Sequence, residues 1–371
     1  MIRSKLPPRG SPEEVKYWER IKNGEAELVR QELGYSDRYA LYKALRKRGF
    51  VLDIPWGAQG EKIGNAKEPE VKIITPQIIP YKPPKSGRGD PETQVVIIGD
   101  DHAGEITPTF NAEVYKERFR KLFESVLTIT KLHRHMYPLN DLVILDVGDN
   151  VHGENPFQGA TVEAVSCGAV NQVYDLALPT ILELLISFRQ EFRTVKFYGV
   201  RGNHGRYSLT APRTSNWDMA LYKVLAKTKL PSGIEIKYSE DFKIIPTIEG
   251  FKFFVFHADQ CSARMGIPYF ALTRKVKDWY STFGGFPYAV CGHFHKEDFL
   301  RIWSETKLLI NGSLVTDDPY ALEIIGASSI PTHWTFGVHK HQGLTWLYSL
   351  TLDDAFLPHK HGEKGEWLVE K

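Results

Sequence analysis

Seven side chains that can bind a divalent metal lie at the ends of predicted strands. Each of these strands is a short apolar run that stops at a carboxylate, an amide or an imidazole. Because open α/β sheets place their binding sites at the carboxyl ends of strands, we expect these side chains to meet. They are Asp100, His102, Asp149, Asn203, His257, His293 and His295.

The chemistry of this set favours two metal ions over one. Oxygen and imidazole ligands without a thiolate suit manganese, iron, zinc or a similar divalent ion. Seven ligands are more than one metal ion with open coordination positions can accept, whereas two metals that share a bridging carboxylate would use them all. Such a pair lowers the pKa of bound water and neutralises charge on phosphoryl oxygens in the transition state. The three cysteines, Cys167, Cys261 and Cys291, show no paired spacing, so neither a thiolate zinc site nor a disulfide framework is predicted.

The order of the motifs resembles that of the calcineurin-like metallophosphoesterases over about residues 94–315. The motifs are Asp100-x-His102, Gly148-Asp149, Gly202-Asn203-His204, His257 and Gly292-His293-x-His295. The resemblance implies one metal held by Asp100, His102 and His295, a second held by Asn203, His257 and His293, and Asp149 bridging both. It also implies two divalent ions, with manganese expected and zinc, iron, nickel and magnesium as alternatives.

His204 is the catalytic residue that the resemblance implies, placed to contact the phosphate and to assist the leaving oxygen. Two positions depart from the family pattern. Gly205 stands where many relatives carry an acidic residue that orients this histidine, so the orienting partner must come from elsewhere. Asp101 could face the metals in place of Asp100, although strand alternation favours Asp100 and His102 on one side.

Three further side chains are candidates for contact with the substrate. Arg201 and Arg206 flank the catalytic loop and could bind a phosphate, or could equally act as structural counter-charges. His152 follows the bridging carboxylate and could also touch the substrate. We expect the other histidines to lie at the surface, and these are His133, His135, His333, His339, His341, His359 and His361.

Strands that alternate with helices and then follow one another predict a layered α/β fold. In the first half we expect strands at 95–98, 142–147 and 195–200 and helices at 113–135, 162–188 and 216–228. In the second half we expect strands at 251–256, 288–291, 307–310, 332–338 and 344–350. The predicted fold class is a layered α/β/β/α metallophosphoesterase sandwich with a small N-terminal all-α module.

The N-terminal segment resembles a helix-turn-helix module of DNA-binding proteins. Helices are expected from about 13 to 23, 25 to 33 and 37 to 48, with Leu41 and Leu45 facing inward. Arg30 departs from the motif because a small residue is usual there. The alternative is a helical hairpin that docks on the main domain or on a partner. The candidate DNA contacts are Arg38, Tyr42, Lys43, Arg46, Lys47 and Arg48.

Composition and charge divide the chain. Residues 1–92 hold 18 Lys and Arg against 13 Asp and Glu, although the net charge of all 371 residues is only +2. This excess favours a polyanionic partner. No apolar run of spanning length and no signal region are apparent, so we expect a cytoplasmic protein without a membrane partner. The expected divisions are a helical module at 1–55, a Pro/Gly-rich linker at 56–92, the metallophosphoesterase domain at 93–355 and a tail at 356–371.

The ligand set and the basic N-terminal segment together predict a two-metal phosphodiesterase or nuclease. It would hydrolyse nucleic acid, with DNA expected, by attack of hydroxide on phosphorus in line with the leaving oxygen. One alternative is a phosphatase or cyclic-nucleotide phosphodiesterase for a small substrate, in which the N-terminal module only docks or mediates oligomerisation. Another is a DNA-binding regulator without catalysis.

Overall fold

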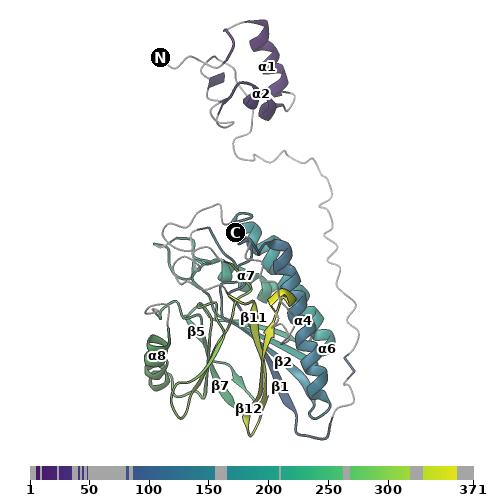
Figure 1. The fold of residues 1–371 in the computed structure, drawn as a ribbon, viewed down its shortest axis with the longest axis vertical. Coiled ribbons are helices and arrows are strands. Elements are labelled where there is room, and N and C mark those ends of the chain that lie inside the picture. The colour runs from purple at the N-terminus through teal and green to yellow at the C-terminus, as the bar shows by residue number, and fades with distance from the viewer. Residues whose placement is uncertain are drawn as a thin grey trace, which may run out of the picture. The chain divides into compact units, whose positions relative to one another are not determined.

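The computed structural model divides the chain into two compact units, Met1–Thr75 and Pro76–Lys371 (Figure 1). The structure describes residues 6–8, 11–22, 25–35, 41, 44–45, 48, 81–82, 87–154, 165–208, 210–261, 268–317 and 329–356. Most of the expected linker and nearly all of the expected C-terminal tail lie outside these ranges.

The first unit is built around a small apolar core. Helix α1 covers Pro12–Lys22 and helix α2 covers Ala26–Glu32. Leu41 and Leu45 are fully buried against residues of both helices, which confirms the inward face expected for them. The Arg48 guanidinium donates to the buried Glu14 carboxylate at 2.6 Å, so Arg48 was wrongly expected to be an exposed DNA contact. The other candidate contacts, Arg38, Tyr42, Lys43, Arg46 and Lys47, lie outside the described residues.

The second unit contains two mixed sheets. The first has the order β12-β11-β1-β2-β3-β4, in which β1 to β4 are parallel and β11 and β12 are antiparallel additions. Its strands are β1 (Glu92–Ile98), β2 (Leu139–Asp146), β3 (Thr194–Gly199), β4 (Ile234–Tyr238), β11 (Thr332–His339) and β12 (Gly343–Thr351). The near-continuous Val/Ile run of β1 is typical of a strand that is covered on both faces.

The second sheet has the order β5-β7-β8-β10-β9, and β6 pairs with β7 beside this path. In this sheet β7, β8 and β10 run parallel, so β7 and β8 end at the same edge. The strands are β5 (Lys243–Ile244), β6 (Thr247–Ile248), β7 (Phe251–Phe256), β8 (Tyr288–Cys291), β9 (Asp298–Arg301) and β10 (Lys307–Ile310).

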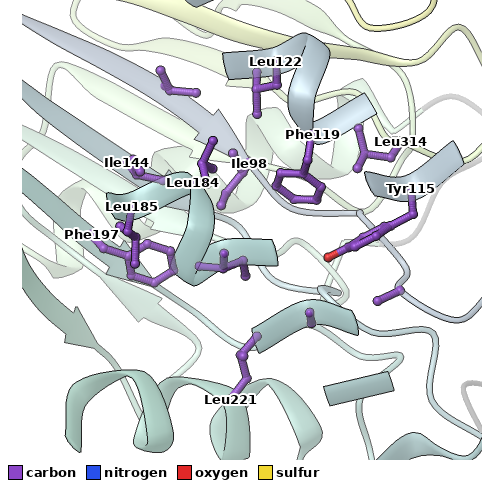
Figure 2. Close-up of a cluster of buried hydrophobic side chains, with 14 of the residues drawn as sticks. Ile98, Tyr115, Phe119, Leu122, Ile144, Leu184, Leu185, Phe197, Leu221 and Leu314 are labelled. Carbon is purple, nitrogen blue, oxygen red and sulfur yellow. The ribbon is translucent and has the colours of Figure 1, made fainter. Parts of the chain in front are cut away.

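Helices cover the outer faces of both sheets. Figure 1 shows α4 (Ala112–Arg134) and α6 (Leu178–Glu191) side by side over the first sheet, while α8 (Tyr269–Thr282) lies over the second. Side chains of α4, α6 and α7 (Trp217–Lys227) interlock with those of the first sheet in the core drawn in Figure 2. Separate apolar clusters fill the space between the sheets and beneath α8. These layers confirm the expected α/β/β/α sandwich.

The helix expected at 162–188 begins later and is irregular. It starts with α5 (Ala169–Asn171), continues through the π-helical turn η2 (Gln172–Ala177) and ends in α6. The Glu154 carboxylate accepts a hydrogen bond from Ala169 N at 3.0 Å, which accounts for the start of the helix at that residue. By length and composition Ala169–Glu191 could cross a membrane, but half of its most apolar window is buried inside the fold, as in a core helix.

Three histidines that were expected at the surface are buried or half-buried. His333 is fully buried and His339 is 7% exposed, because the strand that carries them lies inside the sheet between β1 and β12. His133 is half-buried and stacks on Trp346 at 4.1 Å between ring centroids. His135 and His341 are exposed as expected, whereas His359 and His361 lie outside the described residues.

Candidate metal centre

The loops after five strands bring the predicted ligands together. These loops follow β1, β2 and β3 of the first sheet and β7 and β8 of the second. Three groups of metal-competent side chains result, and in each the ligand atoms lie within 4.8 Å of one another. One of them, His102 with His152 and His204, includes two residues outside the predicted ligand set. The other two consist of predicted ligands alone. The first group contains Asp100, His102 and His295, and the second contains Asp149, His257 and His293. Asn203 joins the second group through its side-chain oxygen, 2.9 Å from His257 Nε2.

The backbone of these loops is strained where the ligands stand. A left-handed conformation, with φ between 46° and 76°, is adopted by Asp100, His102, Asp149, His293 and His295. Such residues cost on the order of 1 kcal/mol each and cluster at functional sites. Strand alternation is therefore the wrong reason for grouping Asp100 with His102, because both lie in a turn beyond the end of β1. The turn is held instead by hydrogen bonds from their amides to Gly148 O and Asp149 O, at 2.8 and 3.0 Å.

The first group contains buried polar atoms that a cation would satisfy. Asp100 Oδ2 accepts from His293 N at 2.7 Å, but Oδ1 is buried without a hydrogen-bond partner among the described residues. His102 Nε2 lies 2.9 Å from His295 Nε2, and Asp100 Oδ1 lies 3.9 Å from the same His295 nitrogen. Two imidazole nitrogens and a carboxylate oxygen converging in this way fit one divalent ion.

In the second group, a hydrogen bond to the backbone fixes the orientation of the His257 ring. His257 Nδ1 donates to the carbonyl of Val147 at 2.9 Å, which leaves Nε2 facing Asp149 Oδ2 and Asn203 Oδ1, each at 2.9 Å. Metal-binding histidines characteristically give their outer N–H to such an acceptor. The other oxygen of Asp149, Oδ1, accepts from His204 N at 2.7 Å. The donor set therefore fits a second divalent ion.

Two motif glycines are required by close approach of the carboxylates. A Cβ atom at Gly202 would lie 2.1 Å from Asp149 Oδ1, and one at Gly292 would lie 2.2 Å from Asp100 Oδ2. No side chain fits at these distances. The glycines that precede Asn203 and His293 are thus part of the geometry that holds the two aspartates.

Charge is distributed unevenly over the metal-free site. Burial would lower the pKa of His257, but the Asp149 carboxylate raises it to about 10. Burial would raise the pKa of Asp149, but His257 and His204 hold it well below its usual range. Burial lowers the pKa of His204 and of His293 to about 3, and it lowers that of His102. Burial also raises the pKa of Asp100 well above its ordinary value.

Asp218, which was not predicted as a site residue, joins the loops after β2 and β3. It is fully buried, and its carboxylate accepts from Asp149 N at 3.1 Å, Asn150 N at 3.0 Å and Gly202 N at 2.8 Å. Burial raises its pKa to about 6. It stands in the first turn of α7, whose N-cap is Asn216. Because acidic residues are common in the first turn of helices, local sequence does not distinguish Asp218 from an ordinary helix-start residue.

Asp101 and the substrate-contact candidates take different positions. Asp101 pairs with His333 Nε2 at 3.0 Å and belongs to neither group. The Arg206 guanidinium donates to the Asp259 carboxylate at 2.6 Å, which is the arrangement expected if Arg206 is a structural counter-charge. Arg201 is 6% exposed, and burial lowers its pKa. His152 is brought to the site, with its ring centroid 5.2 Å from that of His204.

The layered sandwich and the paired ligand groups define a metallophosphoesterase type of protein. The sequence model of the calcineurin-like phosphoesterases matches residues 93–307, more than half of the chain. The chain belongs to this family, whose members bind divalent metals. No curated protein matches the sequence significantly.

Solved structures with a similar fold have low sequence identity to this chain. Vps29 complexed with zinc from Entamoeba histolytica is 12% identical, with 70% of this chain and 99% of that chain covered and a TM-score of 0.32. A conserved uncharacterized protein of predicted phosphoesterase type from Streptococcus pneumoniae TIGR4 is 10% identical, with coverages of 70% and 98% and a TM-score of 0.31. A 5'-nucleotidase from Candida albicans is 12% identical, with coverages of 73% and 53% and a TM-score of 0.34. At these scores none of them bears on substrate.

Proposed function

We propose that the protein is a two-metal phosphodiesterase that hydrolyses nucleic acid, with DNA as the substrate and manganese as the metal. The observation that carries the proposal is the pair of buried ligand groups, with Asp149 in one of them and its backbone bonded to the loop of the other. When bound, the metals would supply a nucleophile at neutral pH and neutralise charge on the phosphoryl oxygens. Asp100, His102 and His295 would hold one ion, Asn203, His257 and His293 the other, and Asp149 would bridge them.

The side chains of the site differ in their exposure to solvent. Asp100, His102, Asp149 and His257 are fully buried, whereas Asn203, His204, His293 and His295 are partly exposed. The buried ligands therefore form the floor of the site and the partly exposed ones its mouth. A phosphodiester approaching from solvent would meet the second set first.

His204 is the residue that we assign to the leaving oxygen. Its backbone N–H donates to Asp149 Oδ1, and its ring meets that of His102 edge-on at 4.4 Å between centroids. An imidazole at this place can donate a hydrogen bond or a proton to the oxygen released when the P–O bond breaks. His152 lies beside it and would contact the same part of the substrate.

Two features support a polynucleotide substrate. Residues 1–92 carry a positive excess that suits a phosphate backbone. Near the site, Tyr207 is 45% exposed and packs against Trp217 at 4.4 Å between ring centroids. A supported, exposed aromatic ring can stack a base regardless of its identity.

The test uses the full chain with manganese and four kinds of substrate. These are labelled single- and double-stranded DNA, a chromogenic diester, a cyclic nucleotide and a phosphomonoester. We expect metal-dependent cleavage of DNA that is lost in Asp149→Asn. Hydrolysis of the small esters alone would overturn the DNA assignment, and tight DNA binding without cleavage would overturn the enzymatic one.

A matched pair of variants tests the role of the N-terminal module. Lys43→Ala with Lys47→Ala should weaken DNA cleavage and leave turnover of the chromogenic diester unchanged, because only the polymer would reach the module. Lys223→Ala with Lys227→Ala, on α7, serves as the control for loss of two charges. Equal DNA cleavage by both pairs would favour a module that only docks or oligomerises.

A further inference from the structure

Glu105 is a buried carboxylate that neither the motif analysis nor the family pattern assigns. It is 4% exposed and lies in the loop after β1, three residues beyond His102. Its amide donates to His102 O at 3.0 Å. The position of this side chain is therefore fixed directly from the metal-ligand loop.

The loops after β1 and β2 are joined beside Glu105. Ala103 forms a parallel bridge with Val151, and His152 N donates to Ala103 O at 3.1 Å. Glu105 itself forms an antiparallel bridge with Val165. These backbone bonds hold the carboxylate between two histidines from different loops.

The Glu105 carboxylate faces the Nδ1 atoms of both histidines. Oε2 accepts from His152 Nδ1 at 3.0 Å. It lies 3.6 Å from His102 Nδ1, which is within ion-pairing distance but too far for a hydrogen bond. Because a carboxylate only accepts, the hydrogen of His152 is on Nδ1 and its Nε2 is directed to the other side of the ring. The same orientation directs His102 Nε2 toward His295, where the first metal is expected.

Glu105 has no lysine or arginine partner among the described residues. In the part of the chain that the structure describes, the ionisable groups within 4.0 Å of its carboxylate are the rings of His102 and His152. A carboxylate withdrawn from water is costly unless it is paired and hydrogen-bonded. Glu105 is therefore matched to these two imidazoles and to any positive charge that a bound metal adds to His102.

The structure also explains why an acidic residue does not follow His204. A Cβ atom at Gly205 would lie 2.7 Å from Asn216 Oδ1. That amide caps α7, and its nitrogen donates to Gly202 O at 2.9 Å. The place used by many relatives for an orienting carboxylate is therefore closed here. The buried carboxylate on the loop after β1, Glu105, contacts His102 and His152.

We propose that Glu105 is a shared positioning residue, which orients His102 toward the first metal and His152 toward the substrate beside His204. Removing the partner of a metal-binding imidazole typically costs 10- to 100-fold in metal affinity or activity. The role of Glu105 at His152, here called the substrate arm, rests on the proposed phosphodiesterase function. Its role at His102, the metal arm, does not, because metal binding alone tests it.

The experiment compares Glu105→Gln, His152→Gln and the control Glu113→Gln, which changes an exposed glutamate at the start of α4. Manganese titration calorimetry of each metal-free protein measures the two binding steps. We expect Glu105→Gln to weaken one step by about 10- to 100-fold. His152→Gln and Glu113→Gln should bind both ions as the wild type does. Wild-type binding by Glu105→Gln would overturn the proposal.

The substrate arm is read at saturating manganese with a diester that has an alkoxide leaving group. Glu105→Gln and His152→Gln should each slow turnover, and the double variant should be no slower than the slower single variant, because the two residues act as one unit. Independent, multiplying effects would overturn the shared role. If no diester is hydrolysed, the phosphodiesterase function fails while the metal arm still decides the position of Glu105.

Glu105→Asp provides the second reading if Glu105→Gln does not fold. The shorter side chain keeps the negative charge but withdraws it from both rings. We expect binding of the affected metal to be weaker than in the wild type. Unchanged affinity in this variant would contradict the proposal in the same way.

Discussion

His102 and His257 hold corresponding places in the two ligand groups, yet their surroundings differ. His257 donates to a backbone carbonyl and faces Asp149 at 2.9 Å, and this carboxylate raises its pKa to about 10. His102 faces another imidazole at 2.9 Å, and burial lowers its pKa. Without metal, the His257 imidazole is therefore protonated and positively charged at neutral pH. The His102 imidazole is neutral.

The two proposed metals would therefore compete with different numbers of protons for their ligands. An ion entering the second group must displace the His257 proton, whereas His102 is already a free ligand. The Asp149 carboxylate acts in both states of the protein. Without metal it stabilises the proton on His257, and with metal it would bridge the two ions.

Asp149→Asn removes the contrast altogether. The amide cannot hold the His257 proton by charge or bridge two cations, so we expect no measurable turnover and at most one bound manganese ion per chain. Metal analysis after gel filtration, alongside activity, measures both. Full occupancy by two ions in this variant would contradict the bridging role.

His204→Gln should preserve metal binding and impair only catalysis. His204 is not one of the predicted ligands, although its ring nitrogen lies within 4.8 Å of those of His102 and His152. Two ions should still bind, while turnover should fall by about 10²- to 10⁴-fold. Turnover and metal stoichiometry are measured on the same sample. Loss of one metal would show that His204 is a ligand and not a catalytic residue.

The pH dependence of metal binding should come from His257. Its pKa of about 10 lies above the ordinary value of about 6.5, so its proton is bound at neutral pH and lost on metal binding. Affinity for the second ion should therefore rise about tenfold per pH unit below pH 10. Calorimetry in buffers of different ionisation enthalpy should show one proton fewer released by His257→Gln and no change in His102→Gln. Equal proton release by both variants and the wild type would refute this assignment.

Asp218→Asn acts on the loops of the second group. It removes charge from an acceptor of three backbone N–H bonds and turns an amide N–H₂ toward at least one of those donors. We expect a loss of about 1–3 kcal/mol in the free energy of unfolding, measured by urea denaturation. Burial raises the pKa of Asp218 to about 6, above its ordinary value of about 3.9, so protonation of this carboxyl stabilises the folded wild type. The loss caused by the variant, which cannot titrate, should therefore grow as pH falls from about 6 toward 4. A pH-independent loss would show that the Asp218 carboxyl does not titrate in this range in the folded protein.

Ser313→Ala is the corresponding change for the first group, and the smallest. The hydroxyl donates to Asp100 O at 2.7 Å and accepts from Val315 N at 3.0 Å, and the residue is fully buried. We expect about 1 kcal/mol of destabilisation and a change of a few fold in affinity for the first ion only. An equal effect on both binding steps would show that the groups are not separable.

The strands could be predicted because their chemistry is local. The apolar runs before Asp100, Asp149 and His257 mark buried strands, and each ends within three residues of the predicted point. Their meeting follows from the rule that site residues gather at the carboxyl ends of parallel strands. This is why the two ligand groups could be anticipated without coordinates.

The supporting residues could not be predicted, because their role depends on distant backbone. Glu105 and Asp218 look like ordinary loop and helix-start acids until the loops after β1, β2 and β3 are placed around them. Asp101 and His333 are 232 positions apart, so nothing local identifies their pair or the burial of His333. The left-handed turns at the ligands were missed for the same reason, since tertiary contacts stabilise them against local preference.

Anomalous diffraction from manganese-soaked crystals would show whether two metals bind across Asp149. We predict two peaks per chain, one enclosed by Asp100, His102 and His295 and one by Asn203, His257 and His293, with an Asp149 oxygen in contact with both. A single peak, or two peaks that do not share Asp149, would contradict it.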